Sequence, residues 1–130
     1  ARLRRTRMGL TLSKHRFLSA QMAAWLTDDL WLEMARAANA AAARLAGGLP
    51  DGALAHPVEA NAVFARLPRH ALRRLARAGV GFKLWDLPEP DLDAGPDRAP
   101  LTARFVCDWT AGAARVDATL DALRSALREG

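Results

Sequence analysis

The spacing of apolar residues predicts two consecutive helices in the first third of the chain. Apolar side chains between Leu18 and Leu26 recur every three or four positions, which predicts a helix over residues 13–27. A longer apolar stripe from Leu30 to Leu45 predicts a second helix, which ends at a pair of glycines. Asp28 and Asp29 separate the two stripes, and their carboxylates are expected to cap the second helix.

The remaining pattern predicts a small α/β layer, in which a sheet carries helices on one face. Short apolar runs predict strands over residues 53–55, 62–65, 80–85 and 101–109. Helices are expected at residues 69–77 and after Thr110, where apolar residues again recur at helical spacing, and Thr110 is expected to cap the last helix. Residues 86–100 are acidic and rich in proline, so they are expected to form an irregular loop.

Composition limits the class of protein. The 130 residues, about half of them apolar, suffice for one domain with a core. No apolar run reaches the roughly 18 residues that a membrane span requires, so we expect no membrane partner. The single cysteine excludes an internal disulfide and favours a reducing, cytoplasmic setting. The chain starts at Ala1 rather than methionine, which suggests a fragment, a processed chain or a trimmed one.

The net charge of +5 comes almost entirely from arginine. Arginine together with abundant alanine is also typical of a GC-rich genome. The charge is therefore weak evidence for a nucleic-acid partner, and we expect none.

Few residues offer recognisable chemistry. No nucleophile elbow, P-loop or dinucleotide-binding glycine motif is present. His15, His56 and His70 are far apart and lack the spacing of metal ligands, so no metal site is expected. Cys107 lies in a predicted strand and is interpreted as a buried apolar residue rather than a nucleophile.

Three basic residues have a functional and a structural interpretation. Lys14 follows a serine and could bind a carbonyl cofactor, but taken alone it is better explained as a solvated lysine at a helix start. Arg16 lies where a loop becomes a helix, a place that suits a phosphate group. Arg104 lies between Ala103 and Phe105 in an apolar strand. If that face is buried, Arg104 needs an anion, and otherwise it points outward from a half-exposed strand.

Three segments resemble the low-specificity L-threonine aldolases, a family of β-eliminating lyases. Residues 4–21 resemble the segment that follows the Schiff-base lysine of these enzymes, although many relatives have Gly-Gly-Gly-Met-Arg where this chain has Leu-Ser-Lys-His-Arg. The run His-Pro-Val-Glu-Ala-Asn-Ala-Val-Phe at residues 56–64 resembles an Asn-x-Val-Phe strand of the small domain. Residues 104–107 resemble the Arg-Leu-Val strand. Together the segments cover most of the chain in the family's order.

The resemblance implies a fold type I enzyme that uses pyridoxal 5'-phosphate. It implies a mainly antiparallel sheet of about three or four strands with helices on one face, as in the C-terminal small domain of such enzymes. Residues 1–28 would be a linker and helix that follow the large domain, and residues 29–130 would form the small domain. The full-length enzyme would be a homodimer or homotetramer.

The resemblance also implies roles for two arginines. Arg104 matches the arginine that binds the carboxylate of the amino-acid substrate, and Arg16 matches the arginine that binds the cofactor phosphate of the neighbouring subunit. The reaction would cleave L-threonine and other β-hydroxy-α-amino acids to glycine and an aldehyde. The Schiff-base lysine would lie before Ala1, so no residue of this chain is expected to be catalytic, and the chain alone is expected to be inactive.

Three alternatives stay open at this point. The chain could be the small domain of another pyridoxal-phosphate-dependent lyase or transferase. It could also be a non-enzymatic module whose arginine-rich start binds nucleic acid, or a helical protein-interaction domain.

Overall fold

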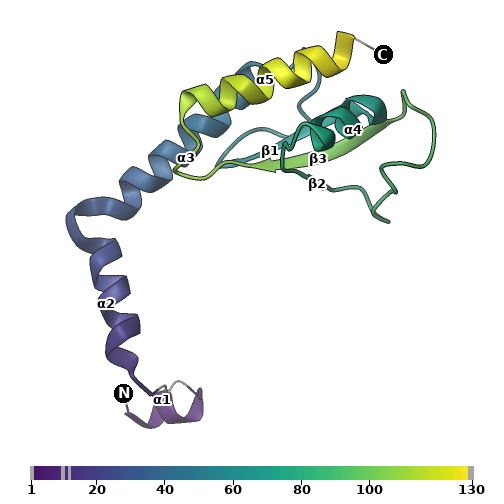
Figure 1. Cartoon of the computed structure of the whole chain (residues 1–130). Coiled ribbons are helices and arrows are strands. Elements are labelled where there is room, and N and C mark those ends of the chain that lie inside the picture. Colours follow the sequence, from purple (N-terminus) through teal and green to yellow (C-terminus); the bar gives the residue numbers. More distant parts are fainter. Residues whose placement is uncertain (1, 10, 12, 129–130) are drawn as a thin grey trace. The chain divides into compact units, whose positions relative to one another are not determined.

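The computed structural model describes residues 2–9, 11 and 13–128 (Figure 1). Contacts within the chain divide it into two compact units, Ala1–Glu33 and Met34–Gly130. The first unit holds α1 (Arg2–Arg7), α2 (His15–Leu26) and a short 3-10 helix η1 (Thr27–Asp29). Helix α3 (Leu30–Gly47) begins in the first unit and ends in the second.

The first unit confirms the predicted helix over residues 13–27, but the turn after it differs from the prediction. Asp28 and Asp29 have left-handed φ angles of 52° and 58°. An N-cap residue usually has an extended backbone and accepts a hydrogen bond from the next turn. The two aspartates instead form the left-handed turn between α2 and α3. The short helix α1 was not predicted from the sequence.

The second unit contains a three-stranded antiparallel sheet in the order β1-β3-β2. The strands are β1 (Ala62–Pro68), β2 (Lys83–Leu84) and β3 (Pro100–Val106). Helix α4 (Arg69–Arg77) follows β1 directly, and α5 (Ala113–Arg128) closes the chain. The predicted small α+β fold with a mainly antiparallel sheet is therefore confirmed. The strands expected over residues 80–85 and 101–109 are shorter, and Leu54 in the run 53–55 forms only an isolated bridge with Ala65.

Helices α3, α4 and α5 cover one face of the sheet. Alternate residues of β1 and β3 point to this face and are buried, because side chains along a strand alternate between faces. One core cluster joins the sheet to the three helices and includes Val63, Phe105, Leu45, Leu72 and Leu120. Arg44 of α3 also binds Asp117 of α5 through two hydrogen bonds of 2.7 Å. This pairing lowers the pKa of the exposed Asp117 carboxyl.

A glycine allows α3 and α5 to approach closely. A Cβ atom on Gly48 would overlap the side chain of Leu120, whereas nothing lies within 4 Å of a Cβ on Gly47. Leu120 is only 4% exposed, so its side chain has little room to move away. The two glycines that were predicted only to end the helix thus differ, and Gly48 is required by packing.

The loop over residues 86–100 is irregular, as predicted, and α4 holds it in place. The guanidinium of Arg69, itself 7% exposed, donates to the carbonyl of Asp91. Arg73 pairs with Asp97, and the backbone N–H of Arg69 donates to the carbonyl of Ala99. The helix thereby fixes the approach of the chain to β3.

The start of α5 differs from the prediction. The hydroxyl and the backbone N–H of Thr110 both donate to Asp108, at 2.6 and 2.7 Å. The hydroxyl is therefore turned away from the helix, and the carbonyl of Gly112 instead accepts from the first turn of α5. The expected Thr110 cap is wrong because the aspartate competes for the hydroxyl.

Among the described helices, none is long and apolar enough to cross a membrane.

Candidate functional site

Arg104 lies in the central strand, on the face of the sheet that the helices leave uncovered. Its neighbours Ala103 and Phe105 are 0% and 5% exposed and point into the core, so Arg104 projects to the opposite side. In the sheet register Arg104 is opposite Phe64 of β1 and Lys83 of β2. Directly paired residues point to the same face, so these three side chains share what we call the helix-free face.

Aromatic rings surround part of Arg104 on the helix-free face. The guanidinium carbon lies 4.8 Å from the centre of the Trp85 ring, a cation–π contact. The centre of the Trp85 ring lies 5.2 Å from the centre of the Phe64 ring, and the centre of the Phe64 ring lies 5.4 Å from that of the His56 ring. Both pairs of rings have edge-to-face geometry. The Arg104 side chain is consequently half-buried although it points away from the core.

The Nε atom of Arg104 is buried and has no hydrogen-bond partner among the described residues. A buried N–H without an acceptor is costly, and such cases in folded proteins call for an explanation. No carboxylate in the described part of the chain pairs with this guanidinium. A guanidinium presents parallel N–H groups that match the two oxygens of a carboxylate. Arg104 is therefore suited to bind an anionic group that no described residue supplies.

Arg16 belongs to the first unit and is exposed in the first turn of α2. Its guanidinium carbon lies 5.0 Å from the centre of the neighbouring Phe17 ring. The N-cap residue, Lys14, has a left-handed φ of 55° and makes no side-chain cap hydrogen bond. The start of α2 thus combines backbone N–H groups without a side-chain cap with exposed positive charge, which suits a phosphate.

Lys14, His15 and His70, the other polar candidates, lie in surroundings that do not indicate a catalytic or metal-binding role. Lys14 is exposed at the start of α2, as expected for a solvated lysine. His15 is hydrogen-bonded to Ser19 over 3.1 Å, and His70 contacts the carbonyl of Asp97 over the same distance. No group of three or more metal-binding side chains occurs within the described residues.

Cys107 is a buried apolar residue, as predicted, although it lies one residue beyond β3. The side chain is 7% exposed, and this burial raises the pKa of its thiol. The backbone around it pairs with Asn61, whose amide donates to the Cys107 carbonyl over 2.8 Å. A thiol that stays protonated in a packed core is a poor nucleophile.

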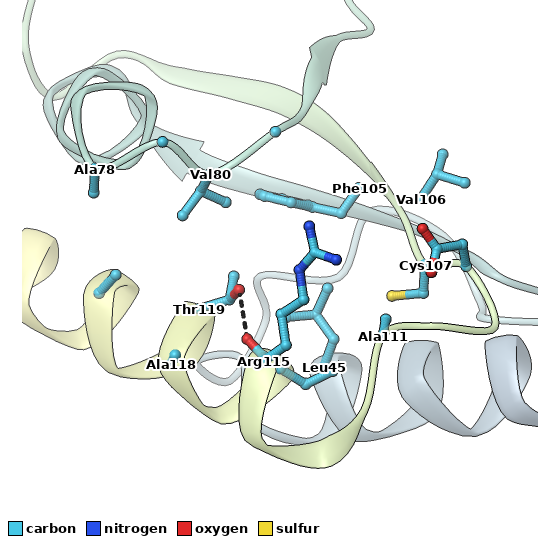
Figure 2. Close-up of a pocket in the computed structure, with 15 residues that line it drawn as sticks. Leu45, Ala78, Val80, Phe105, Val106, Cys107, Ala111, Arg115, Ala118 and Thr119 are labelled. Atoms are coloured by element: carbon cyan, nitrogen blue, oxygen red, sulfur yellow. Dashed lines mark hydrogen bonds between the residues drawn. The ribbon is translucent and has the colours of Figure 1, made fainter.

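An open pocket of about 420 Å³ lies between α5 and the helix-covered side of the sheet (Figure 2), and Arg104 is not among its lining residues. Val80, Phe105 and Ala111 line it, and the exposed Arg115 of α5 extends into it. Asp108 also lines the pocket, and the hydrogen bonds that Thr110 donates to its carboxyl group lower the pKa of that group. None of the side chains that line the pocket has a buried polar atom without a hydrogen-bond partner. The pocket therefore gives a weaker chemical indication of a ligand than Arg104 does.

Sequence reasoning singled out Arg104 as a candidate but missed the aromatic rings near it. Phe64, Lys83, Trp85 and Arg104 each lie in or next to a strand and point away from the core. The alternation of side chains in each strand could have assigned these residues to one face. Only the strand order β1-β3-β2 brings them together.

Comparison with curated proteins confirms the resemblance to the low-specificity L-threonine aldolases. The chain is 36% identical over 111 residues to the low specificity L-threonine aldolase of Pseudomonas aeruginosa. The same identity and length are found with the low specificity L-threonine aldolase of Pseudomonas sp. (strain NCIMB 10558). Each match covers 83% of this chain, but the chain spans only 29% of the length of either relative. No protein-family model matches the chain.

Proposed function

We propose that this chain, which is related in sequence to the low-specificity L-threonine aldolases, forms the C-terminal domain of a pyridoxal-phosphate-dependent aldolase. The enzyme would cleave L-threonine and similar β-hydroxy-α-amino acids to glycine and an aldehyde. The observation that carries the proposal is the half-buried Arg104 guanidinium, with its unpartnered Nε, at the position that resembles the family's carboxylate-binding arginine.

Arg104 would bind the substrate carboxylate through two parallel N–H donors. Holding that group fixes the rotation of the substrate about Cα and so orients the Cα–Cβ bond that breaks. When bound, pyridoxal phosphate supplies the electron sink that accepts the electron pair of this bond. The contact with Trp85 partly shields the half-buried Arg104 from water, which would strengthen its attraction for the carboxylate.

Two features of the chain fit the cofactor and its assembly. Arg16 is exposed beside an uncapped helix start, and residues 2–16 hold six positive side chains and no acidic one. We assign Arg16 to the cofactor phosphate of a neighbouring subunit in a homodimer or homotetramer. The lysine that bonds to the cofactor is assigned to the rest of the longer protein.

Glycine release tests the proposed activity. The longer protein that contains this chain is expected to convert L-threonine to equal amounts of glycine and acetaldehyde, and the chain by itself is expected to give neither. Glycine is quantified by chromatography and acetaldehyde by a coupled reduction. Loaded protein that leaves L-threonine, L-allo-threonine and β-phenylserine intact would show that the aldolase proposal is wrong.

Replacing Arg16 with alanine tests the phosphate assignment. Loss of one charge-assisted contact of about 1.5–3 kcal/mol should weaken retention of the cofactor roughly 10- to 100-fold. Equilibrium dialysis followed by the visible absorbance of bound cofactor measures this retention. Arg36→Ala, which removes an exposed arginine from α3, is the matched control and should retain the cofactor normally. Equal retention in both variants, or a monomer by light scattering, would remove the assignment to a neighbouring subunit.

A further inference from the structure

Two hydrogen bonds with the backbone of Thr102 hold Trp85 and its neighbour Asp86 against β3. The Trp85 N–H donates to the Thr102 carbonyl over 2.9 Å. The N–H of Thr102 donates in turn to the carboxylate of Asp86 over 2.6 Å. Both backbone groups of Thr102 are thus used by consecutive residues, Trp85 and Asp86. The chain stays attached to β3 one residue beyond the two-residue strand β2.

This attachment determines where the Trp85 ring lies. Trp85 follows Lys83 by two residues, so its side chain points to the same helix-free face. There the ring contacts the Arg104 guanidinium, and the edge contact with Phe64 supports it from the other strand. Trp85 is 45% exposed and is not part of the core cluster, so its ring contacts on this face are those with Arg104 and Phe64.

We propose that Trp85 is a positioning residue that holds the Arg104 guanidinium ready to bind a substrate carboxylate. The inference rests on the proposed carboxylate role of Arg104. A free arginine side chain has many rotamers, and confining them before binding lowers the entropy that binding must overcome. The guanidinium carbon lies over the ring, and a cation–π contact restricts the side chain without using its N–H donors. Asp86 contributes indirectly, because its hydrogen bond to Thr102 fixes the backbone next to the ring.

Nuclear magnetic resonance of the Arg104 Nε–H in the chain tests this proposal. The resonance is assigned by its loss in Arg104→Lys, and two properties are measured. The first is the rate of hydrogen exchange with water. The second is the shift on titration with L-threonine, compared with L-threoninol, which lacks the carboxylate. The variants are Trp85→Leu, Trp85→Phe and the control Trp109→Leu, which removes a more exposed indole, 57% against 45% for Trp85.

The expected result separates positioning from general structure. Trp85→Leu should speed exchange of the Nε–H and weaken L-threonine binding about tenfold, which corresponds to about 1.4 kcal/mol. Trp85→Phe should keep most of the slow Nε–H exchange and most of the L-threonine affinity of the unchanged chain, because a phenyl ring keeps the cation–π contact. Trp109→Leu should match the unchanged chain, and L-threoninol should give no shift. Should Trp85→Leu fail to fold, Asp86→Ala loosens the same ring and is expected to weaken binding several-fold.

Other results identify which proposal fails. If L-threonine binds the unchanged chain and Trp85→Leu equally, the positioning role is wrong while the carboxylate role of Arg104 stands. If L-threonine and L-threoninol act alike in every variant, the carboxylate role fails and Trp85 has no ligand to position. If the Arg104 Nε–H exchanges with water equally fast in the unchanged chain and in Trp85→Leu, the contact between Trp85 and Arg104 does not restrict the guanidinium and the proposal is wrong.

Discussion

Replacing Arg104 with alanine is expected to reduce kcat/KM for L-threonine more than any other single change considered. Removing one partner of a partly desolvated charge pair typically costs about 2–5 kcal/mol, which corresponds to roughly 30- to 5,000-fold in kcat/KM. The loss should appear in KM and in kcat, because Arg104 would both bind the carboxylate and orient the scissile bond. Steady-state release of glycine from the longer enzyme measures it.

Two matched variants show whether position or charge accounts for the effect. Arg104→Lys keeps the positive charge but loses the planar pair of donors, so an intermediate loss is expected. Arg66 is opposite Thr102 and points to the helix-free face, but it is exposed. Arg66→Ala should therefore leave kcat/KM almost unchanged. Equal losses in Arg66→Ala and Arg104→Ala would indicate a general effect of charge, and unchanged kinetics in Arg104→Ala would contradict the assignment.

Cofactor retention distinguishes the two proposed arginine sites. Arg104 is assigned to the substrate, so Arg104→Ala should keep the visible absorbance of bound cofactor. Arg16→Ala should lose that absorbance on dialysis and keep its KM for L-threonine once cofactor is restored. The reverse pattern would mean that the two assignments are exchanged.

The regular elements follow from local patterns, whereas the strand ends depend on contacts that the sequence does not reveal. The apolar stripe of α5 and the short apolar run at the start of β1 were sufficient to predict both elements, although β1 continues to Pro68. The strand expected over residues 80–85 is shorter because the N–H of Val80 donates to Leu75, at the end of α4. At the other end the carboxylate of Asp86 replaces a backbone acceptor for the N–H of Thr102. Both contacts join segments that are brought together only by the fold.

The candidate site shows the same division between local and tertiary information. An arginine between Ala103 and Phe105 was recognisable in the sequence as a guanidinium within an apolar strand. Whether it pointed to the core or away from it depended on which face the helices cover, and the structure shows that it points away. Its partial burial comes from Trp85, which is nineteen positions earlier in the chain. A strand order that places β3 in the centre of the sheet is needed to bring them together.

Replacing Leu72 with alanine is expected to give the largest loss of stability in the second unit. Leu72 is 0% exposed and belongs to the core cluster that joins α4 to the sheet. Truncating a buried leucine to alanine costs about 2–5 kcal/mol, a large part of a typical total of about 5–15 kcal/mol. Leu87→Ala makes the same chemical change at a side chain that is 93% exposed, and should alter stability by less than about 0.5 kcal/mol.

Cys107 provides a measurement of this loss that is specific to the second unit. It is the only cysteine of the chain, and it is buried in the same core cluster as Leu72. Cys107 lines the open pocket but is only 7% exposed, so a thiol reagent should label it slowly in the folded core and much faster once that core opens. The urea dependence of the labelling rate therefore reports unfolding of Met34–Gly130 rather than of the first unit. The labelling midpoint of Leu72→Ala should shift to clearly lower urea, and that of Leu87→Ala should not. Coincident midpoints for the two variants would mean that α4 does not complete the core that holds the sheet and Arg104 in place.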